Sequence, residues 1–277
     1  MPELPEVETV KNALAPHLQG KIIKACHFFT AGLRQKLDEE LFNNAFIGTK
    51  IIRLKRRSKY LIFELDNNKW ILSHLGMTGS WRLCPSTEAR KKHEHISVLL
   101  GDGTQDLRYC DPRRFGEFRM ITAPLNKDDD PQALAHLGPE PFDDAFNQAY
   151  LWNLSRNKTK AVKGFIMDPK TVCGIGNIYA SETLFRCGIS PLRKTQKLTK
   201  KDCHNLISHS QEVLQQAIAA GGTTIIDFQA PDGSEGWFHQ QLNVYGRNGK
   251  KCTTCDKVIK RVVQTGRSSF YCPGCQK

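Results

Sequence analysis

The sequence lacks several features that would place it in other classes of protein. No apolar run approaches the ~18 residues that a membrane-spanning helix needs, and no basic amphipathic helix stands out. Acidic residues within the first six positions exclude a typical secretory signal peptide. The chain also has no internal repeat and no long low-complexity segment. We therefore expect a soluble globular protein without a membrane partner.

Positive charge is what the chain has in excess. Its 277 residues carry 40 Lys and Arg against 28 Asp and Glu, which gives a formal net charge of +12. Such an excess indicates a polyanionic partner, of which nucleic acid is the commonest. The length is sufficient for two domains with sizeable cores.

Four of the ten cysteines have the spacing of a structural zinc site. Cys252 and Cys255 are separated by 16 residues from Cys272 and Cys275, and the stretch between them predicts two short strands around 265–266. A site with four cysteine ligands has no open position, so one zinc ion would fold a β-hairpin ribbon and perform no chemistry. A disulfide pair is the alternative. The other six cysteines show no paired spacing, which fits a reducing cytosol.

The first residues, Met-Pro-Glu-Leu-Pro-Glu, combine an amine with two carboxyl groups. If Met1 is removed, Pro2 presents an α-amine, a group that titrates near ~7.7–8, against ~10.4 for lysine. At neutral pH more of this α-amine than of a lysine amine is therefore uncharged, and an uncharged amine can attack an aldehyde-like carbon to form a Schiff base. Glu3 and Glu6 could move protons in such a reaction. A structural interpretation is also open, because Pro5 and acids in a first turn are common at helix starts.

The hydrophobic patterning changes along the chain. Residues 5–18 predict a helix, and five short β-rich runs predict a β-sandwich. These runs lie at residues 47–54, 59–65, 70–75, 95–100 and 115–121. Helical patterns dominate from about 131 to 220, and residues 223–243 have the composition of a loop. The fold class is therefore α+β with several domains.

Two predicted turns present side chains suited to entering a base stack. Residues 74–79 should expose Met77, and residues 111–116 should expose Arg113 and Phe115. An apolar wedge beside an arginine is typical of proteins that unstack DNA. The alternative is that Met77 and Phe115 cap a local hydrophobic cluster.

Two further segments suit phosphate binding. The basic run at 55–59 precedes a strand, although solvated charge is the default interpretation of such a run. Residues 173–182 place two glycines and Asn177 before a helix, whose N-terminal N–H groups would bind a phosphate. The same segment is superficially similar to a dinucleotide fingerprint, but Tyr179 occupies the position of the third glycine and no βαβ unit surrounds it.

Seven segments, in order and followed by the cysteine ribbon, resemble those of the bacterial formamidopyrimidine-DNA glycosylases along essentially the whole chain. They are PELPEVET (2–9), RRSKYL (56–61), HLGMTGS (74–80), DPRRFG (111–116), LGPEP (137–141), GIGNIYASE (174–182) and QLNVYGR (241–247). The resemblance implies an N-terminal β-sandwich with flanking helices, a helix–two-turn–helix domain and a C-terminal zinc ribbon. We expect these parts at 1–124, 149–242 and 243–277, with a linker at 125–148.

The resemblance also assigns the chemistry. Pro2 would be the nucleophile that attacks the sugar C1′ carbon, Glu3 the proton donor and Glu6 its support. Lys59 and Arg267 would be the proton donors for β-elimination and δ-elimination.

Six residues fall on DNA-binding positions of the family: Met77, His93, Arg113, Phe115, Lys158 and Asn177. Met77, Arg113 and Phe115 match residues that fill the gap left by a flipped nucleotide. Lys160 is the alternative to Lys158, and residues 223–239 match a loop that covers the lesion.

The activity implied is a bifunctional DNA glycosylase and lyase of base excision repair that removes 8-oxoguanine and formamidopyrimidines. We expect a monomer that acts on double-stranded DNA in the bacterial cytoplasm. Two alternatives stay open: a non-catalytic zinc-ribbon protein that binds nucleic acid, and a relative of the endonuclease VIII type that prefers oxidised pyrimidines.

Overall fold

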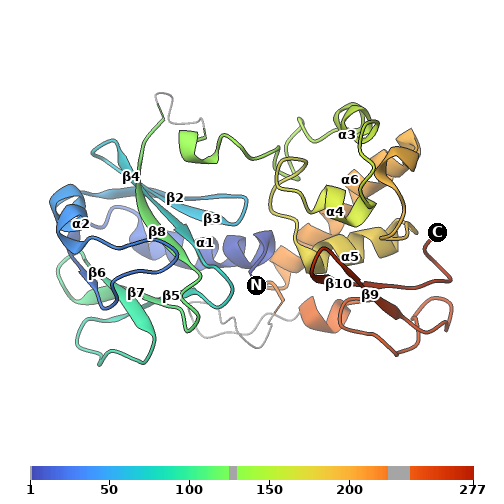
Figure 1. Cartoon of the computed structure of the whole chain (residues 1–277). Helices are drawn as coiled ribbons and strands as arrows, with labels where there is room; N and C mark the ends of the chain where they lie inside the picture. The colour runs from blue at the N-terminus through green and yellow to red at the C-terminus, as the bar shows by residue number, and fades with distance from the viewer. Residues whose placement is uncertain (1, 125–129, 224–237) are drawn as a thin grey trace. The chain divides into compact units, whose positions relative to one another are not determined.

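The computed structural model describes residues 2–124, 130–223 and 238–277 (Figure 1). The chain divides into two compact units. The first comprises Met1–Ala135 and Ala220–Trp237, and the second comprises His136–Ala219 and Phe238–Lys277.

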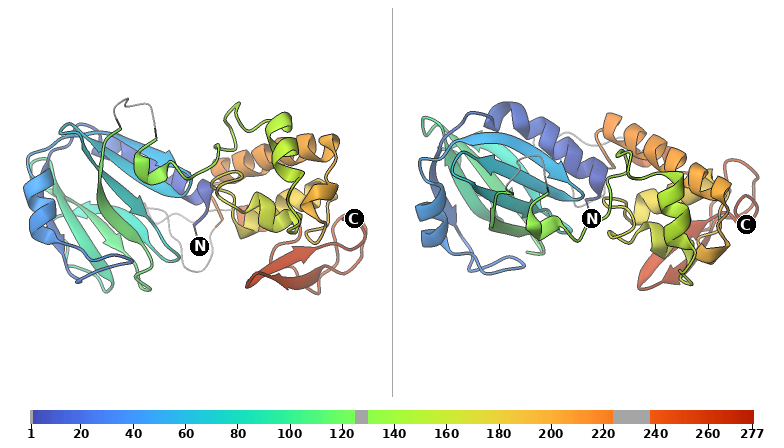
Figure 2. Two further views of the ribbon diagram at one scale, coloured as in Figure 1. Left: turned by 45° about the horizontal axis from the view of Figure 1, so that its top comes forward. Right: turned by 90° about the horizontal axis from the view of Figure 1, so that it is seen from above.

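Two four-stranded antiparallel sheets form the first unit (Figure 2). One sheet has the order β2 (Ile51–Arg57), β3 (Tyr60–Leu65), β4 (Lys69–His74) and β8 (Glu117–Thr122). The other has the order β1 (Ile23–Phe28), β6 (Glu94–Leu100), β7 (Gln105–Cys110) and β5 (Ser80–Pro85). Both sheets contribute to one hydrophobic core, so the predicted β-sandwich is confirmed.

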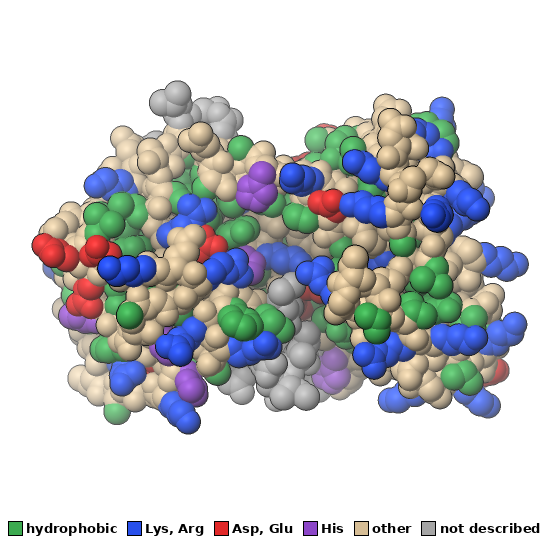
Figure 3. Space-filling model, viewed as in Figure 1, with side chains coloured by type: hydrophobic (Ala, Val, Ile, Leu, Met, Phe, Trp, Pro, Cys, Tyr) green, Lys and Arg blue, Asp and Glu red, His purple; other side chains and the backbone are tan. Residues whose placement is uncertain are grey.

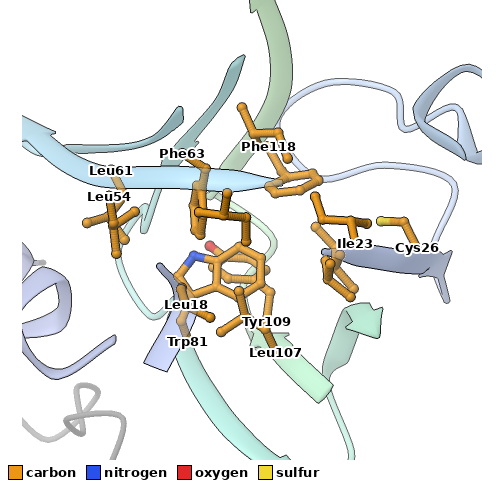
Figure 4. Close-up of a cluster of buried hydrophobic side chains, with 14 of the residues drawn as sticks. Leu18, Ile23, Cys26, Leu54, Leu61, Phe63, Trp81, Leu107, Tyr109 and Phe118 are labelled. Carbon is orange, nitrogen blue, oxygen red and sulfur yellow. The ribbon is translucent and has the colours of Figure 1, made fainter. Parts of the chain in front are cut away.

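The centre of this core is aromatic (Figure 4). Trp81 is fully buried, and its ring centroid lies 4.9 Å from that of Tyr109 and 5.8 Å from that of Phe63. Its indole N–H donates to the Ser73 hydroxyl at 3.0 Å, so the one polar atom of the indole is satisfied. The core therefore holds the two sheets face to face.

Two helices flank the sandwich. Helix α1 (Leu4–Leu18) packs against β2, β3 and β5, and α2 (Glu39–Phe46) packs against β1. The apolar face of α1, with Val7, Val10 and Leu14, enters the core, which confirms the helix predicted at 5–18.

The runs predicted at 59–65, 70–75 and 95–100 match strands β3, β4 and β6, but the predicted starts of the first and last runs are wrong. The run at 47–54 was expected to begin a strand at 47, but β2 starts at Ile51 because Gly48 adopts φ 81 after α2 ends. The run at 115–121 was expected to include Phe115, but β8 starts at Glu117 because the preceding residues form a turn in which Arg114 has φ 55.

Four helices and a hairpin form the second unit. The helices are α3 (Gln148–Ser155), α4 (Val162–Ile166), α5 (Asn177–Arg186) and α6 (Lys200–Ala219). Helix α5 packs against α4, α6 and the hairpin strand β10. The helical character predicted for 131–220 is confirmed for this part of the chain.

The hairpin consists of β9 (Lys260–Gln264) and β10 (Arg267–Tyr271). Thr265 and Gly266 both have positive φ, at 46° and 76°, as a two-residue type I′ turn requires. The predicted β-hairpin ribbon is therefore confirmed. Our four-segment division of the chain stays a prediction, and the structure adds that the ribbon packs with α5 in one unit.

Candidate functional site

The N-terminal constellation lies at the first turn of α1. Pro2 is buried, and Glu3 and Glu6 are 2% and 1% exposed. Glu3 and Glu6 form a reciprocal capping box, in which the Glu3 N–H donates to Glu6 Oε2 at 2.8 Å. The same residues therefore start the helix and form the constellation expected to carry chemistry.

Glu6 also binds a distant segment of the first unit. Its Oε1 accepts the N–H of Thr223 at 2.8 Å. Gly222 precedes it with φ 83, and a Cβ at this position would lie 3.1 Å from Glu6 Oε1. Glycine therefore permits the close approach that lets Glu6 join the N-terminus to Thr223. Residues 224–237 of the expected lesion loop lie outside the described residues.

Lys59 occupies the tight turn between β2 and β3. Ser58 and Lys59 are the two residues between the paired strand ends, and Ser58 has φ 56. The nearby imidazole of His74 is affected by this lysine. Burial, then the charges of Arg34 and Lys59, lower the pKa of His74 to about 3.

The neutral His74 acts as a hydrogen-bond acceptor. Its Nδ1 receives the N–H of Gly76 at 2.9 Å, which fixes the start of the turn that carries Met77. We did not predict His74 as a site residue, although it opens the HLGMTGS segment.

Asp111 is fully buried and joins the turns at residues 74–79 and 111–116, which we call the wedge turns. Its carboxylate accepts from the Thr78 hydroxyl of one turn and from the N–H of Gly116 in the other, the latter at 2.8 Å. The N–H of Arg113 lies 3.3 Å from Asp111 Oδ1. A Cβ on Gly76 would lie 2.6 Å from the Gly116 nitrogen, so the turns are in close contact. The sequence did not predict this role for Asp111, which begins the DPRRFG segment.

The turns present the expected side chains to different degrees. Phe115 is 46% exposed, and the guanidinium carbon of Arg113 lies 4.7 Å from the centre of its ring. Met77 is half-buried, although the sequence suggested that its turn would expose it. His93 has φ 69, and its carbonyl accepts the N–H of Asp111 at 3.0 Å. The structure therefore brings the segments of Met77, His93, Arg113 and Phe115 together.

A basic pocket of about 240 Å³ lies in the second unit and includes Asn177 and Arg267. Its buried lysine, Lys163, donates to Asn177 Oδ1 at 2.6 Å, to the Ser268 carbonyl at 3.0 Å and to the Ser269 hydroxyl at 2.9 Å. Lys163 thus joins the start of α5 to β10. Lys163 lies five residues after Lys158 and three after Lys160, but the sequence did not predict its role.

Lys158 and Lys160 differ in their contacts. Lys160 Nζ binds Asp168 Oδ2 at 2.6 Å. Lys158 is exposed, and no ion pair involves it among the residues that the structure describes. The ammonium of Lys160 is therefore engaged within the protein, and the assignment of Lys158 as a DNA contact stays a prediction.

Glu182 is a further residue that sequence reasoning missed. Its buried carboxylate accepts the N–H groups of Asn243, Val244 and Tyr245, each at 2.9 Å. These partners lie in the QLNVYGR segment, and Glu182 ends the GIGNIYASE segment. Glu182 therefore attaches the chain entering the ribbon to α5.

The four ribbon cysteines have the geometry of a zinc site. Their Sγ atoms all lie within 4.8 Å of one another, with Cys252 and Cys275 3.9 Å apart and Cys255 and Cys272 3.3 Å apart. Zn–S bonds of ~2.3 Å in a tetrahedron place sulfur atoms ~3.8 Å apart. Burial raises the pKa of the Cys252 thiol, but hydrogen bonds from the N–H groups of Thr254 and Cys255 and from the thiols of Cys272 and Cys275 outweigh it, and the net pKa is about 7. The ligand set fits one structural zinc, as predicted.

The face shown in Figure 3 carries many Lys and Arg side chains and few Asp and Glu side chains. Within the described ranges, no helix is both long and apolar enough to cross a bilayer.

Comparisons with known proteins agree with this geometry. Three family models match: the formamidopyrimidine-DNA glycosylase N-terminal domain at 1–118, its H2TH domain at 137–229, and a zinc finger found in FPG and IleRS at 249–277. The chain is 44% identical to formamidopyrimidine-DNA glycosylase of Pasteurella multocida (strain Pm70) over the full length of both.

Two solved structures of Lactococcus lactis Fpg are similar over the whole of both chains. One, a variant bound to DNA containing Fapy-dG, is 32% identical with a TM-score of 0.89. The other, bound to DNA containing an abasic site, is 31% identical with a TM-score of 0.88. The motifs, the fold and these similarities together show that the chain belongs to the formamidopyrimidine-DNA glycosylase family.

Proposed function

We propose that the protein is a bifunctional DNA glycosylase and lyase of base excision repair that removes 8-oxoguanine and formamidopyrimidines. The observation that carries this proposal is the buried constellation of Pro2, Glu3 and Glu6. A protein that only binds DNA does not need an amine beside two buried carboxyl groups. The formamidopyrimidine in the name of its relative and the Fapy-dG in the DNA of one solved complex support the formamidopyrimidine part of this substrate class.

Base removal begins with the Pro2 amine after Met1 has been removed. The neutral amine forms a bond to C1′ while the glycosidic bond breaks, and the base leaves with the N–H proton that the amine gives up. Glu3 donates one proton to O4′ as the C1′–O4′ bond breaks and the sugar ring opens. The product is a Schiff base between Pro2 and C1′. Glu6 supports this step by holding the N–H of Glu3.

Strand cleavage follows from the Schiff base. The iminium group acidifies C2′, and loss of a C2′ proton allows the C3′–O bond to break with release of the 3′ phosphate. Loss of the C4′ proton then allows the C5′–O bond to break, with release of the 5′ phosphate. Lys59 and Arg267 supply protons to the leaving phosphates in these steps.

Binding requires that the damaged nucleotide leave the stack. Met77, Arg113 and Phe115 fill the gap, which fits the exposed Phe115 ring beside the Arg113 guanidinium. His93 and Lys158 contact the DNA, and Asn177 contacts a phosphate. The protein acts on double-stranded DNA as a monomer.

Borohydride trapping tests the proposal. The protein is incubated with duplexes that contain 8-oxoguanine, thymine glycol or an abasic site, and the products are separated on a denaturing gel. We expect excision of 8-oxoguanine, doubly cleaved product and a trapped adduct that peptide sequencing places on Pro2. Retained Met1 or Pro2→Gly should strongly reduce excision and trapping. Undiminished trapping through Lys59 would refute the nucleophile assignment, and preferred cleavage at thymine glycol would refute the substrate class.

A further inference from the structure

A charged pair links helix α1 to the strand that leads into the Lys59 turn. Glu8, on α1, accepts from Arg56 Nε at 2.7 Å through Oε2, and Lys11 Nζ binds its Oε1. The side chains of Arg56 and Glu8 are 11% and 17% exposed. Burial raises the pKa of Glu8, but hydrogen bonds and charge from Lys11 and Arg56 outweigh it and leave the pKa below its usual value. The pair is therefore ionised at neutral pH.

Arg56 also binds the turn itself. Its Nη1 donates to the Ser58 carbonyl at 3.0 Å. Ser58 is 4% exposed and has φ 56, at the first position of a two-residue hairpin turn. Glycine is preferred at a first position with positive φ, so a serine there is strained. The hydrogen bond from Arg56 opposes relaxation of this strained peptide.

The two ends of this bridge carry different parts of the chemistry. Pro2 and Glu3 lie at the start of α1, and Lys59 directly follows Ser58 in the turn. We propose that Glu8 and Arg56 are positioning residues that fix Lys59 relative to Pro2; this inference rests on the proposed function. An arginine is needed because its planar fork binds in two directions at once, whereas a lysine ammonium cannot hold both partners in the same geometry.

The matched test compares Arg56→Lys with Arg53→Lys. Arg53 lies three residues earlier on β2, where its Nε donates to Glu64 Oε2 at 2.9 Å. Both substitutions keep the charge and remove a guanidinium fork. Two single-turnover rates are measured on duplexes with a preformed abasic site: borohydride-trappable adduct, which reports Pro2, and β-elimination, which reports Lys59.

Arg56→Lys should slow β-elimination about tenfold and change adduct formation by less than about twofold, because misplacement of one catalytic group affects only its own step. Arg53→Lys should leave both rates unchanged. Glu8→Gln should slow β-elimination selectively as well, but less than Arg56→Lys does, because only the bridge to α1 is weakened while the Arg56–Ser58 contact remains.

Ser58→Gly provides a second readout. Glycine adopts positive φ without the side-chain penalty, so the turn no longer needs Arg56 to hold it. In the Ser58→Gly background, Arg56→Lys should therefore slow β-elimination less than in the parent chain, and the loss that remains should match that of Glu8→Gln, as a double-mutant cycle measures. A protein in which Arg56 supports only the fold would show the same loss in both backgrounds.

The outcomes separate the two proposals. A parent protein that forms no adduct and cleaves no strand overturns the proposed function and this inference with it. An active parent whose Arg56→Lys and Glu8→Gln variants lose both steps equally, or lose neither, overturns only the bridge. If Arg56→Lys does not fold, Glu8→Gln decides the question by the same two rates.

Discussion

Replacement of Asp111 by asparagine should unfold the paired wedge turns. The side chain is the same size, but one carboxylate oxygen becomes an NH₂ group. In the structure each oxygen faces donors, with Gly116 N–H on Oδ2 and the Thr78 hydroxyl and Arg113 N–H on Oδ1. Whichever way the amide is turned, an NH₂ group meets a buried donor.

The magnitude follows from these contacts. A hydrogen bond to a charged group contributes ~1.5–3 kcal/mol, and a buried donor without a partner costs ~1–3 kcal/mol. We therefore expect Asp111→Asn to lower the free energy of unfolding of the first unit by about 3 kcal/mol. In a unit of this size that corresponds to a fall in Tm of roughly 6–12 °C. Asp102→Asn, in an exposed turn where the carboxylate also accepts an N–H and a hydroxyl, is the matched control and should have a smaller effect.

Differential scanning calorimetry and guanidinium denaturation measure the loss of stability. Single-turnover excision of 8-oxoguanine should fall as well, at a temperature where the variant remains folded, because Arg113 and Phe115 no longer have a fixed turn. If Asp111→Asn changes the free energy of unfolding by less than about 0.5 kcal/mol, the buried carboxylate does not organise the turns, and our account of the site is wrong.

Three further predictions concern other parts of the molecule. Removal of zinc by a chelator should unfold the ribbon and weaken DNA binding through loss of the Arg267 position, since zinc contributes on the order of 10 kcal/mol to such elements; full DNA affinity in metal-free protein, verified by elemental analysis, would contradict this. Phe115→Ala and Met77→Ala should impair single-turnover excision of 8-oxoguanine more than cleavage of a preformed abasic site, because only the first substrate has a base to extrude; equal losses would limit both side chains to local packing. The pKa of His74 is lowered to about 3 in the folded protein, so the unfolded chain binds the extra proton between about pH 3 and 6.5 and stability falls as the pH decreases through that range. From pH 7 to pH 5 this residue should cost about 2 kcal/mol, and denaturation of His74→Gln at both pH values should show a smaller dependence than the parent.

The sequence alone determined the elements that depend on residues close together in the chain, namely the zinc ligands, helix α1 and the ribbon hairpin. The sequence identified the zinc ligands because two CxxC pairs together supply the four thiolates of a closed zinc site. Helix α1 was predicted because Val7, Val10 and Leu14 repeat at the helical period. The hairpin was predicted because Thr265-Gly266 lies between two strand-like runs and suits a turn with two positive φ values.

Three strands were missed, and tertiary contacts determine the burial of one of them. Strand β7 contains Asp106 and Arg108, which are charged yet 7% and 4% exposed. Arg108 binds Asp106 at 3.1 Å, and its other nitrogen lies 3.4 Å from Glu94 on β6. A hydrophobic pattern cannot reveal a strand whose buried charges are compensated by a neighbouring strand. Strands β1 and β5 were missed as well, although residues 80–83 of β5 (Ser-Trp-Arg-Leu) alternate between polar and apolar side chains.

The candidate site also has a part that the sequence predicted and a part that only the structure shows. The sequence placed Pro2, Glu3 and Glu6 together because they lie within one turn of helix. It did not show that Glu6 binds Thr223, or that Lys163 joins α5 to β10 at 2.6–3.0 Å. Those contacts connect residues more than a hundred positions apart or span separate elements. Only the folded chain brings these donors and acceptors within hydrogen-bonding distance. A hydrogen bond depends on where two atoms lie in space, and it produces no periodic pattern in the sequence.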